Sequence, residues 1–352
     1  MDPEIVTKIK NIIQEKNLDL IIIKNSNKID PTFFWLTGID KGSFEYSDLF
    51  VQLNRIKLIV SHFDIHIANQ WNIPTIISKK GIFERHLKLY KYKRIGVNYS
   101  AITKSDFDNI KKLTRAKLID ISKPLSFARG IKTRQEIKRI KKACKISSSI
   151  MEQISNFIIP GQRENQIAAK IQQLILENGC ISSFDPIVAS GSNSAYMHHS
   201  ITTRKIRHGD LILIDFGVMY KKYCSDISRT FVLGRPNTKQ KKMFDVVQIA
   251  QQLAFDKLKS GVDGKIIYDS VKRFLDSKYP KCFIHSLGHG IGIDVHDFPR
   301  DIGKTNLKTN MIFTIEPGVY IPHFGGIRLE DVVLITKNRY KLLTKPDVEF
   351  II

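Results

Sequence analysis

The first third of the chain alternates short apolar runs with segments of helical periodicity. Apolar, largely β-branched runs bounded by polar residues are typical of buried strands. Six such runs precede residue 122, at residues 20–23, 48–53, 57–60, 75–78, 95–97 and 118–121. Residues 1–16 and 101–113 instead space their apolar side chains as amphipathic helices do. The pattern predicts an α/β domain with its own core over residues 1–122.

The remaining residues, 123–352, begin with a long helical pattern. It runs from Thr133 to about residue 159, where Pro160 and Gly161 end it, and a second helix is predicted at 164–178. Further predicted elements are strands at 210–216 and 225–233 joined through residues 220–222, helices at 238–260 and 264–277, and a strand-rich block at 311–335. The sequence shows no internal repeat. We expect a second domain at 123–352 and an α/β (α+β) fold class for the whole chain.

Charge changes this picture in one respect. Lysine and arginine outnumber aspartate and glutamate by 56 to 34, a net charge of +22. Seven basic residues fall within 79–94 and seven more within 132–145. In the second cluster the apolar positions are helically spaced, so its charges fit the solvated face of a helix. A basic surface attracts polyanions, and we expect only non-specific binding to nucleic acid.

Composition excludes several other classes of protein. Hydrophobic residues make up 42% and charged residues 26% of the 352 residues, as in ordinary globular proteins. The apolar runs are too short to span a bilayer, and the N-terminus lacks the apolar stretch of a signal peptide. Four scattered cysteines without a CxxC pair favour free thiols. We therefore expect a cytoplasmic protein with no membrane association.

The candidate chemistry lies after residue 180. Asp215 and Asp226 end one predicted strand and begin the next, although an aspartate at a strand end is often only a turn former. The segment HSLGHGIGIDVHDFPR, residues 285–300, interleaves three histidines with glycines, which relax the backbone and let a side chain approach a ligand closely. Glu316 and Glu330 lie in apolar, strand-like stretches, where an unpaired carboxylate is costly to bury.

Two aspartates, two glutamates and a histidine form an oxygen-rich ligand set that suits two divalent ions. This set favours Mn²⁺ or Co²⁺, with Zn²⁺ or Fe²⁺ as alternatives. Such a pair of ions generates hydroxide at neutral pH and binds the oxygens of a hydrolytic transition state. The sequence therefore predicts a metal-dependent hydrolase.

The order Asp, Asp, His, Glu, Glu resembles that of the pita-bread metallopeptidases, and HSLGHGIGIDVHD resembles the signature of their prolidase and aminopeptidase P branch. The resemblance runs from residue 131 to the end and is closest to compact archaeal-type prolidases. It implies a creatinase-like N-terminal domain at 1–122 and a pita-bread catalytic domain at 123–352.

The resemblance also implies roles for individual residues. The metal ligands would be Asp215, Asp226, His289, Glu316 and Glu330, with Asp226 and Glu330 bridging the ions. Glu316 would also take a proton from the attacking water. His198 would contact the substrate near the scissile carbonyl, although the doublet with His199 leaves the register open. His296 would assist the oxyanion or the departing proline nitrogen.

Three further residues are expected at the substrate. His285 would line the pocket, and Arg328 would orient ligands beside it. Arg300 would bind the carboxylate of a dipeptide through a bidentate contact.

These assignments predict hydrolysis of Xaa-Pro bonds, most closely as an Xaa-Pro dipeptidase acting on dipeptides or short peptides. The alternative within the class is Xaa-Pro aminopeptidase. A methionine aminopeptidase is disfavoured because it does not normally carry this N-terminal domain, and a non-catalytic binding protein or a metal-free creatine hydrolase is disfavoured because all five ligands are present. The resemblance also implies a homodimer.

Overall fold

The computed structural model describes residues 2–352 and divides into two compact units, Met1–Arg129 and Gly130–Ile352. The division falls at the end of helix α6 (Ser122–Gly130). The hydrophobic pattern placed the boundary at the start of this helix, where the last strand of the first unit ends. No helix in the described part of the chain is long and apolar enough to cross a membrane.

The first unit contains a six-stranded sheet with the order β4-β3-β2-β1-β5-β6. All six strands predicted from the sequence are confirmed: β1 (Leu20–Lys24), β2 (Asp48–Gln52), β3 (Arg55–Val60), β4 (Thr75–Ile77), β5 (Arg94–Val97) and β6 (Lys117–Asp120). Strand β1 lies inside the sheet, antiparallel to β2 and parallel to β5. Its residues are apolar on both faces because both faces are covered.

The helices of the first unit are α1 (Pro3–Glu15), α2 (Pro31–Thr37), α3 (Ile65–Ala68), α4 (Ile82–Leu89) and α5 (Lys104–Leu113). Helices α1 and α5 confirm the two helices that the apolar periodicity predicted. Phe83 and Leu87 of α4 and Ile110 of α5 pack on one face of the sheet, against residues such as Ile22 and Phe50. Helices α2, α3 and α4 span at most 8 residues each, which is too short for a clear periodic signal.

The second unit contains the long helix α7 (Arg134–Phe157) followed by α8 (Glu164–Glu177), α9 (Thr238–Phe255) and α10 (Gly264–Lys278). Thr133 caps α7: its hydroxyl accepts from the backbone of Glu136, whose carboxylate accepts from the backbone of Thr133. This local signal explains why the start of the helix could be predicted. Helix α9 ends earlier than its apolar pattern suggested, because the chain turns after Asp256 towards Gly261, whose φ is +92°.

The strands of the second unit form several small antiparallel sheets. Those before α9 are β7 (Ile181–Ser182), β8 (Ile187–Ser190), β9 (Leu211–Phe216), β10 (Val218–Tyr220), β11 (Tyr223–Cys224) and β12 (Ile227–Val232). Those after α10 are β13 (Ile312–Ile315), β14 (Gly318–Ile321), β15 (Gly325–Arg328), β16 (Asp331–Ile335) and β17 (Tyr340–Leu342). The predicted turn at 220–222 is confirmed, with Lys221 and Lys222 at positive φ between β10 and β11.

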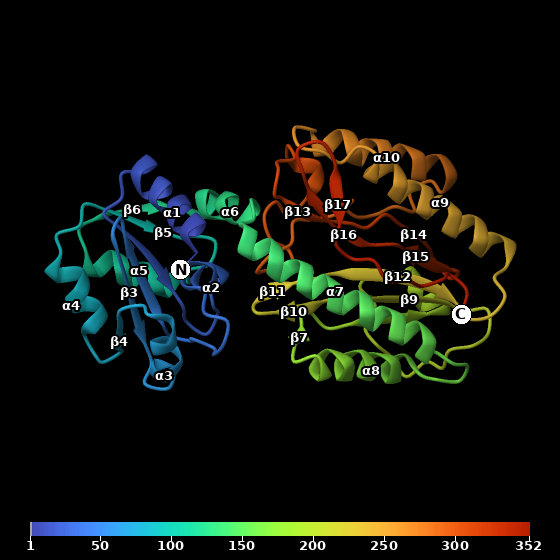
Figure 1. The fold of residues 1–352 in the computed structure, drawn as a ribbon, viewed down its shortest axis with the longest axis horizontal. Coiled ribbons are helices and arrows are strands. Elements are labelled where there is room, and N and C mark those ends of the chain that lie inside the picture. The colour runs from blue at the N-terminus through green and yellow to red at the C-terminus, as the bar shows by residue number, and fades with distance from the viewer. Residues whose placement is uncertain (1) are drawn as a thin grey trace. The chain divides into compact units, whose positions relative to one another are not determined.

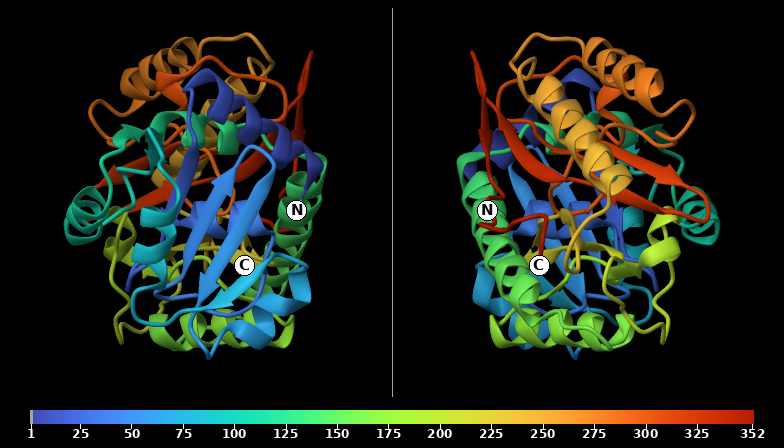
Figure 2. Two further views of the ribbon diagram at one scale, coloured as in Figure 1. Left: turned by 90° about the vertical axis from the view of Figure 1, so that its left-hand side faces the viewer. Right: turned by 90° about the vertical axis from the view of Figure 1, so that its right-hand side faces the viewer.

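The second unit repeats one arrangement of elements, although its sequence shows no repeat. Helices α7 and α8 pack on β9 and β12, and α9 and α10 pack on β13 and β16 (Figure 1). Helices α9 and α10 lie side by side, as the orange pair in Figure 2 shows. In each half, one acidic residue lies at the end of the first strand (Asp215, Glu316) and another directly precedes the second strand (Asp226, Glu330). The fold therefore supplies the acidic residues in equivalent pairs.

Candidate metal centre

Strand pairing brings three of the acidic residues together around Ser228. Asp215 of β9 lies opposite Ser228 of β12. Asp226 precedes Ser228 by two residues and so points to the same face. Glu330 forms a bridge to Ser228, with Glu330 N donating to Ser228 O at 3.1 Å and Ser228 Oγ donating to Glu330 Oε2 at 2.6 Å.

The histidine-rich segment reaches this cluster by pairing with β13. His289 N donates to Thr314 Oγ1 at 3.0 Å, and Thr314 N donates to His289 O at 2.8 Å. A Cβ atom at Gly288 would lie 1.9 Å from Thr314 O, so only glycine permits this approach. The sequence suggested that the glycines let a side chain approach a ligand. At Gly288 the physical reason is instead the close contact of two backbones, which places His289 beside Glu316.

The five predicted ligands converge. One ligand atom each from Asp226, His289 and Glu330 lie within 4.8 Å of one another, and all three residues are buried. His289 Nε2 lies 3.7 Å from both Asp226 Oδ2 and Glu316 Oε1. Asp215 Oδ1 and Asp226 Oδ1 are buried and have no hydrogen-bond partner among the described residues. Buried oxygen atoms without donors are what a hard divalent cation binds, so these residues fit such ions.

The electrostatics of the cluster lead to the same conclusion. Burial, together with the charges of Glu330 and Asp215, raises the pKa of Asp226 well above its usual range. Burial and the charges of Glu316 and Asp215 do the same to the pKa of Glu330, and burial also raises that of Glu316. Burial lowers the pKa of His289. Bound cations would reverse the penalty on the carboxylates, and neutral imidazole is the form of histidine that binds metal.

Arg328 orients this cluster from one side. Its guanidinium donates to Asp215 Oδ2 at 2.5 Å, to Ser228 Oγ at 2.9 Å and to Tyr320 Oη at 3.0 Å. The Arg328 side chain is buried, so it contacts the predicted ligand Asp215 and not an open surface. Ser228, Tyr320 and Thr314 were not predicted from the sequence. Only the two-residue spacing of Ser228 from Asp226 could have indicated one of them.

The remaining predicted residues surround the ligands. His285 Nδ1 lies 3.9 Å from Glu316 Oε2, and its Nε2 lies 3.0 Å from Tyr320 Oη. The rings of His296 and His289 are 4.1 Å apart. Partial burial, and then the charges of His289, Arg300 and His198, lower the pKa of His296 to about 4. Arg300 and His198 therefore lie close enough to His296 to act on it electrostatically, and both are exposed.

The structure separates the two histidines of the doublet. His199 Nε2 contacts Glu164 Oε2 at 3.0 Å, whereas the charge of His198 acts on both His285 and His296. Glu164 is fully buried and also accepts hydrogen bonds from Ser190, Asn193 and Thr202. It thereby fixes residues 190–202, the segment that carries His198. The sequence gave no signal for this role of Glu164.

The antiparallel strands and the buried cluster of carboxylates and histidine define a site for divalent metal ions of the kind that hydrolases use. Comparison with known proteins agrees with this class. Residues 138–337 match metallopeptidase family M24, and residues 6–131 match the creatinase/prolidase N-terminal domain. The chain belongs to metallopeptidase family M24 and is a metal-dependent peptidase.

Individual relatives are similar over the whole chain. An Xaa-Pro dipeptidase from Pyrococcus horikoshii is 35% identical, with 99% of both chains covered. The crystal structure of the prolidase from the same organism superposes with a TM-score of 0.90 at 34% identity over 99% of each chain. The X-Pro aminopeptidase from Thermotoga maritima superposes with a TM-score of 0.89 at 32% identity, covering 96% of this chain and 98% of its own. These matches confirm the family and the two-part fold that the sequence predicted.

Proposed function

We propose that this metallopeptidase hydrolyses the Xaa–Pro bond of dipeptides. The proposal is supported by the close approach of buried Asp226, His289 and Glu330, with Glu316 beside His289, in a chain that resembles an Xaa-Pro dipeptidase over 99% of both lengths. Asp215, Asp226, His289, Glu316 and Glu330 would hold two divalent ions, with Asp226 and Glu330 shared between them. Bound there, the ions would supply Lewis acidity and lower the pKa of a water molecule.

The protein's own groups supply positioning and proton transfer. The Glu316 carboxylate, which lies beside His289 and His285, would accept a proton from the attacking water. His296, held by its ring contact with His289, would donate a hydrogen bond to the developing oxyanion or the departing proline nitrogen. His198 would contact the substrate near its carbonyl, and His285 would line the pocket. Proline has no N–H to be recognised, and none of these groups requires one.

The choice of metal and the setting of the enzyme belong to the same proposal. Four carboxylates against a single imidazole favour Mn²⁺ or Co²⁺, with Zn²⁺ or Fe²⁺ as alternatives. We also propose that the protein is a cytoplasmic homodimer. Metal analysis of the purified protein tests the choice of metal, its mass in solution by light scattering tests the dimer, and fractionation of cells tests the location.

An Xaa-Pro aminopeptidase remains the second candidate because the Thermotoga maritima X-Pro aminopeptidase superposes as well as the prolidases do. Arg300 is the residue that would distinguish a dipeptidase from an aminopeptidase. It is exposed, and its guanidinium would bind a carboxylate one residue beyond the scissile bond. A dipeptide has its proline carboxylate there, whereas a longer peptide has an amide.

The test is a comparison of Ala-Pro with Ala-Pro-Ala as substrates, with Mn²⁺, Co²⁺, Zn²⁺ and Fe²⁺ each supplied in turn. Loss of a charge-assisted hydrogen bond changes kcat/KM by roughly 10- to 150-fold, and we expect the dipeptide to be preferred by that factor. Arg300→Ala should remove most of the preference and leave metal content unchanged. Equal turnover of both peptides by the unmodified protein would favour the aminopeptidase, and no turnover with any metal would contradict both candidates.

A further inference from the structure

One basic surface of the first unit is not explained by peptide hydrolysis. Residues 79–94, which include α4, carry seven lysines and arginines against one glutamate. Six of the seven basic side chains are exposed: Lys79, Lys80, Arg85, Lys88, Lys91 and Lys93. A run of like charges is often only a solvated face. Here, however, it borders two pockets and a group of aromatic rings.

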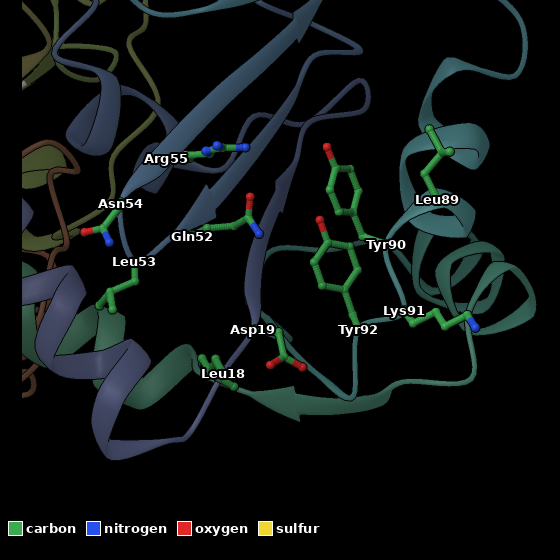
Figure 3. A pocket seen from close by; sticks show the side chains of 10 residues that line it. All are labelled: Leu18, Asp19, Gln52, Leu53, Asn54, Arg55, Leu89, Tyr90, Lys91 and Tyr92. Atoms are coloured by element: carbon green, nitrogen blue, oxygen red, sulfur yellow. The ribbon is translucent and has the colours of Figure 1, made fainter.

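The larger pocket has a volume of about 660 Å³ and lies between the turn that joins β2 to β3 and residues 89–92 (Figure 3). Gln52 and Arg55 extend from the sheet towards the rings of Tyr90 and Tyr92, as Figure 3 shows. Asp19, the acidic residue in its lining, accepts from the backbone of Lys93 and Arg94 at 2.6 and 2.9 Å. This carboxylate thereby fixes the basic segment beside the pocket.

The aromatic rings are held in place by one another. Tyr90 and Tyr92 are stacked with their centroids 5.6 Å apart, and Tyr90 lies 5.0 Å from the ring of His86. His86 in turn lies 4.4 Å from the ring of Phe50, in the core of the unit. Tyr90 remains 44% exposed. It therefore presents an ordered aromatic face to solvent beside an arginine.

A second, smaller pocket of about 450 Å³ continues along α4. Its lining contains Arg85 and Lys88 against one acidic residue, Glu84, and it shares Leu89 with the larger pocket. The two hollows and their positive charges thus follow one another along the surface. An arrangement of this kind suits an extended anion several charges long, more than it suits an isolated small molecule.

We propose that this surface binds single-stranded nucleic acid. One base stacks on Tyr90, its edge is met by Gln52, and the adjoining phosphates are bound by Arg55, Lys88 and Arg85. Ordered aromatic faces beside cations that follow a backbone are how proteins bind single strands without reading sequence. A duplex keeps its bases inside and cannot use Tyr90, and an acidic peptide offers charge without a flat ring. The inference stands apart from the peptidase activity.

The test is fluorescence anisotropy of the full-length, metal-loaded protein with a labelled twelve-nucleotide oligouridylate at 50 and 150 mM KCl. Because stacking contributes substantially per base, Tyr90→Ala should weaken binding by roughly 5- to 100-fold, and Tyr90→Phe should restore it. Arg55→Gln should reduce the slope of log affinity against log salt by about 0.7.

The matched controls are Tyr46→Ala and Lys112→Gln, at exposed positions of the same unit, which should change neither the affinity nor its salt dependence. Circular dichroism and thermal unfolding of each variant report whether the first unit is folded.

Competition experiments decide between this ligand and others. Unlabelled single strand should compete at least about tenfold better than duplex of the same length, uridine monophosphate or polyglutamate. Equal competition by duplex or polyglutamate would show that charge alone is recognised and would overturn the proposal. Equal competition by the free nucleotide would overturn the extended site, and so would binding that is unaffected by Tyr90→Ala.

Discussion

Glu164 and Glu330 lie in two regions of the second unit and are both buried, with 0% and 2% of their surfaces exposed. Their surroundings nevertheless shift their pKa values in opposite directions. Burial alone would raise the pKa of Glu164, but hydrogen bonds from Thr202, His199, Ser190 and Asn193 lower it to about 2. For Glu330, burial and the charges of Glu316 and Asp215 raise the pKa well above its usual range. A buried glutamate is thus structural at position 164 and a candidate metal ligand at position 330.

The two carboxylates differ in the groups that stabilise their negative charge. Around Glu164 the protein supplies backbone and side-chain donors, and the carboxylate is stable as an anion. Around Glu330 the nearest acidic groups repel one another, and two buried carboxylate oxygens in the cluster, on Asp215 and Asp226, have no donor within the described residues. Arg328 supplies one buried positive charge, to Asp215, and the other carboxylates of the cluster are stable as anions only when further cations are bound. Four predictions test the contrast, beginning with the largest effect.

The largest effect is expected from removal of one shared ligand charge. Asp226→Asn or Glu330→Gln should reduce hydrolysis of an Xaa-Pro dipeptide by more than about 10⁴-fold and lower the metal content, because each removes an anion between two cations. The measurements are kcat/KM and metal per chain by mass spectrometry. Asp256→Asn and Glu177→Gln, both exposed, are the matched controls. Full activity with unchanged metal in either ligand variant would disprove the two-ion site.

The residues beside the ligands should behave differently from the ligands. His198→Ala and His296→Ala should lower kcat by roughly 10²–10⁴-fold, the usual range for a positioned acid–base or oxyanion group, while metal content stays near that of the unmodified protein. His199→Ala is the informative comparison for the doublet. If His199→Ala lowers kcat more than His198→Ala does, the two roles are reversed.

Loss of the Glu164 charge should affect stability before chemistry. Glu164→Gln removes an anion whose folded pKa is about 2, and we expect a loss of about 3 kcal/mol in the free energy of unfolding at pH 7. Because the folded pKa is depressed, this stabilisation is present above pH 4.5 and disappears as the pH falls towards 2 in the unmodified protein. Urea unfolding at pH 7 and pH 3 measures it, with the exposed Glu177→Gln of the same helix as control. An equal loss at both pH values would mean that the charge is irrelevant.

Metal removal should give the smallest effect, with the opposite dependence on pH. Saturating metal at about 100 times its Kd stabilises a protein by about 2.7 kcal/mol, so for a chain of 352 residues chelation should lower the Tm by roughly 4 °C at neutral pH. The raised pKa values of Asp226 and Glu330 mean that the folded metal-free protein keeps protons which the unfolded chain releases near pH 4. Above about pH 7 the histidines with lowered pKa values are neutral in both the folded and the unfolded state, so the stability of the metal-free protein should fall as the pH rises further, and Asp226→Asn should flatten that slope. Calorimetry from pH 7 to pH 8.5 that finds the metal-free protein most stable at pH 8.5 would contradict this expectation.

The pattern of neighbouring residues along the chain was sufficient to predict much of the fold. The sequence predicted six strands of the first unit, the capped start of α7 at Thr133 and the turn at 220–222, because residues a few positions apart indicate each of them. The order of acidic residues and the histidine-rich segment likewise indicated a metal-dependent hydrolase before any tertiary contact was known. The short helices α2, α3 and α4 were missed because they contain too few turns to show a period.

Only the tertiary structure decided which side chains complete the site. Ser228 reaches Glu330 across 102 positions of sequence, and Glu164 reaches His199 across 35, so no local pattern could reveal either contact. Position 288 requires glycine because the carbonyl oxygen of Thr314 in β13 lies too close for a side chain. The repeated placement of acidic residues in the two halves appears only when the strands of the two halves are compared. Hydrophobic periodicity specifies which face of an element is buried. The partners met on that face are set by packing between distant segments, and here that packing determines whether a buried carboxylate receives hydrogen bonds or requires a cation.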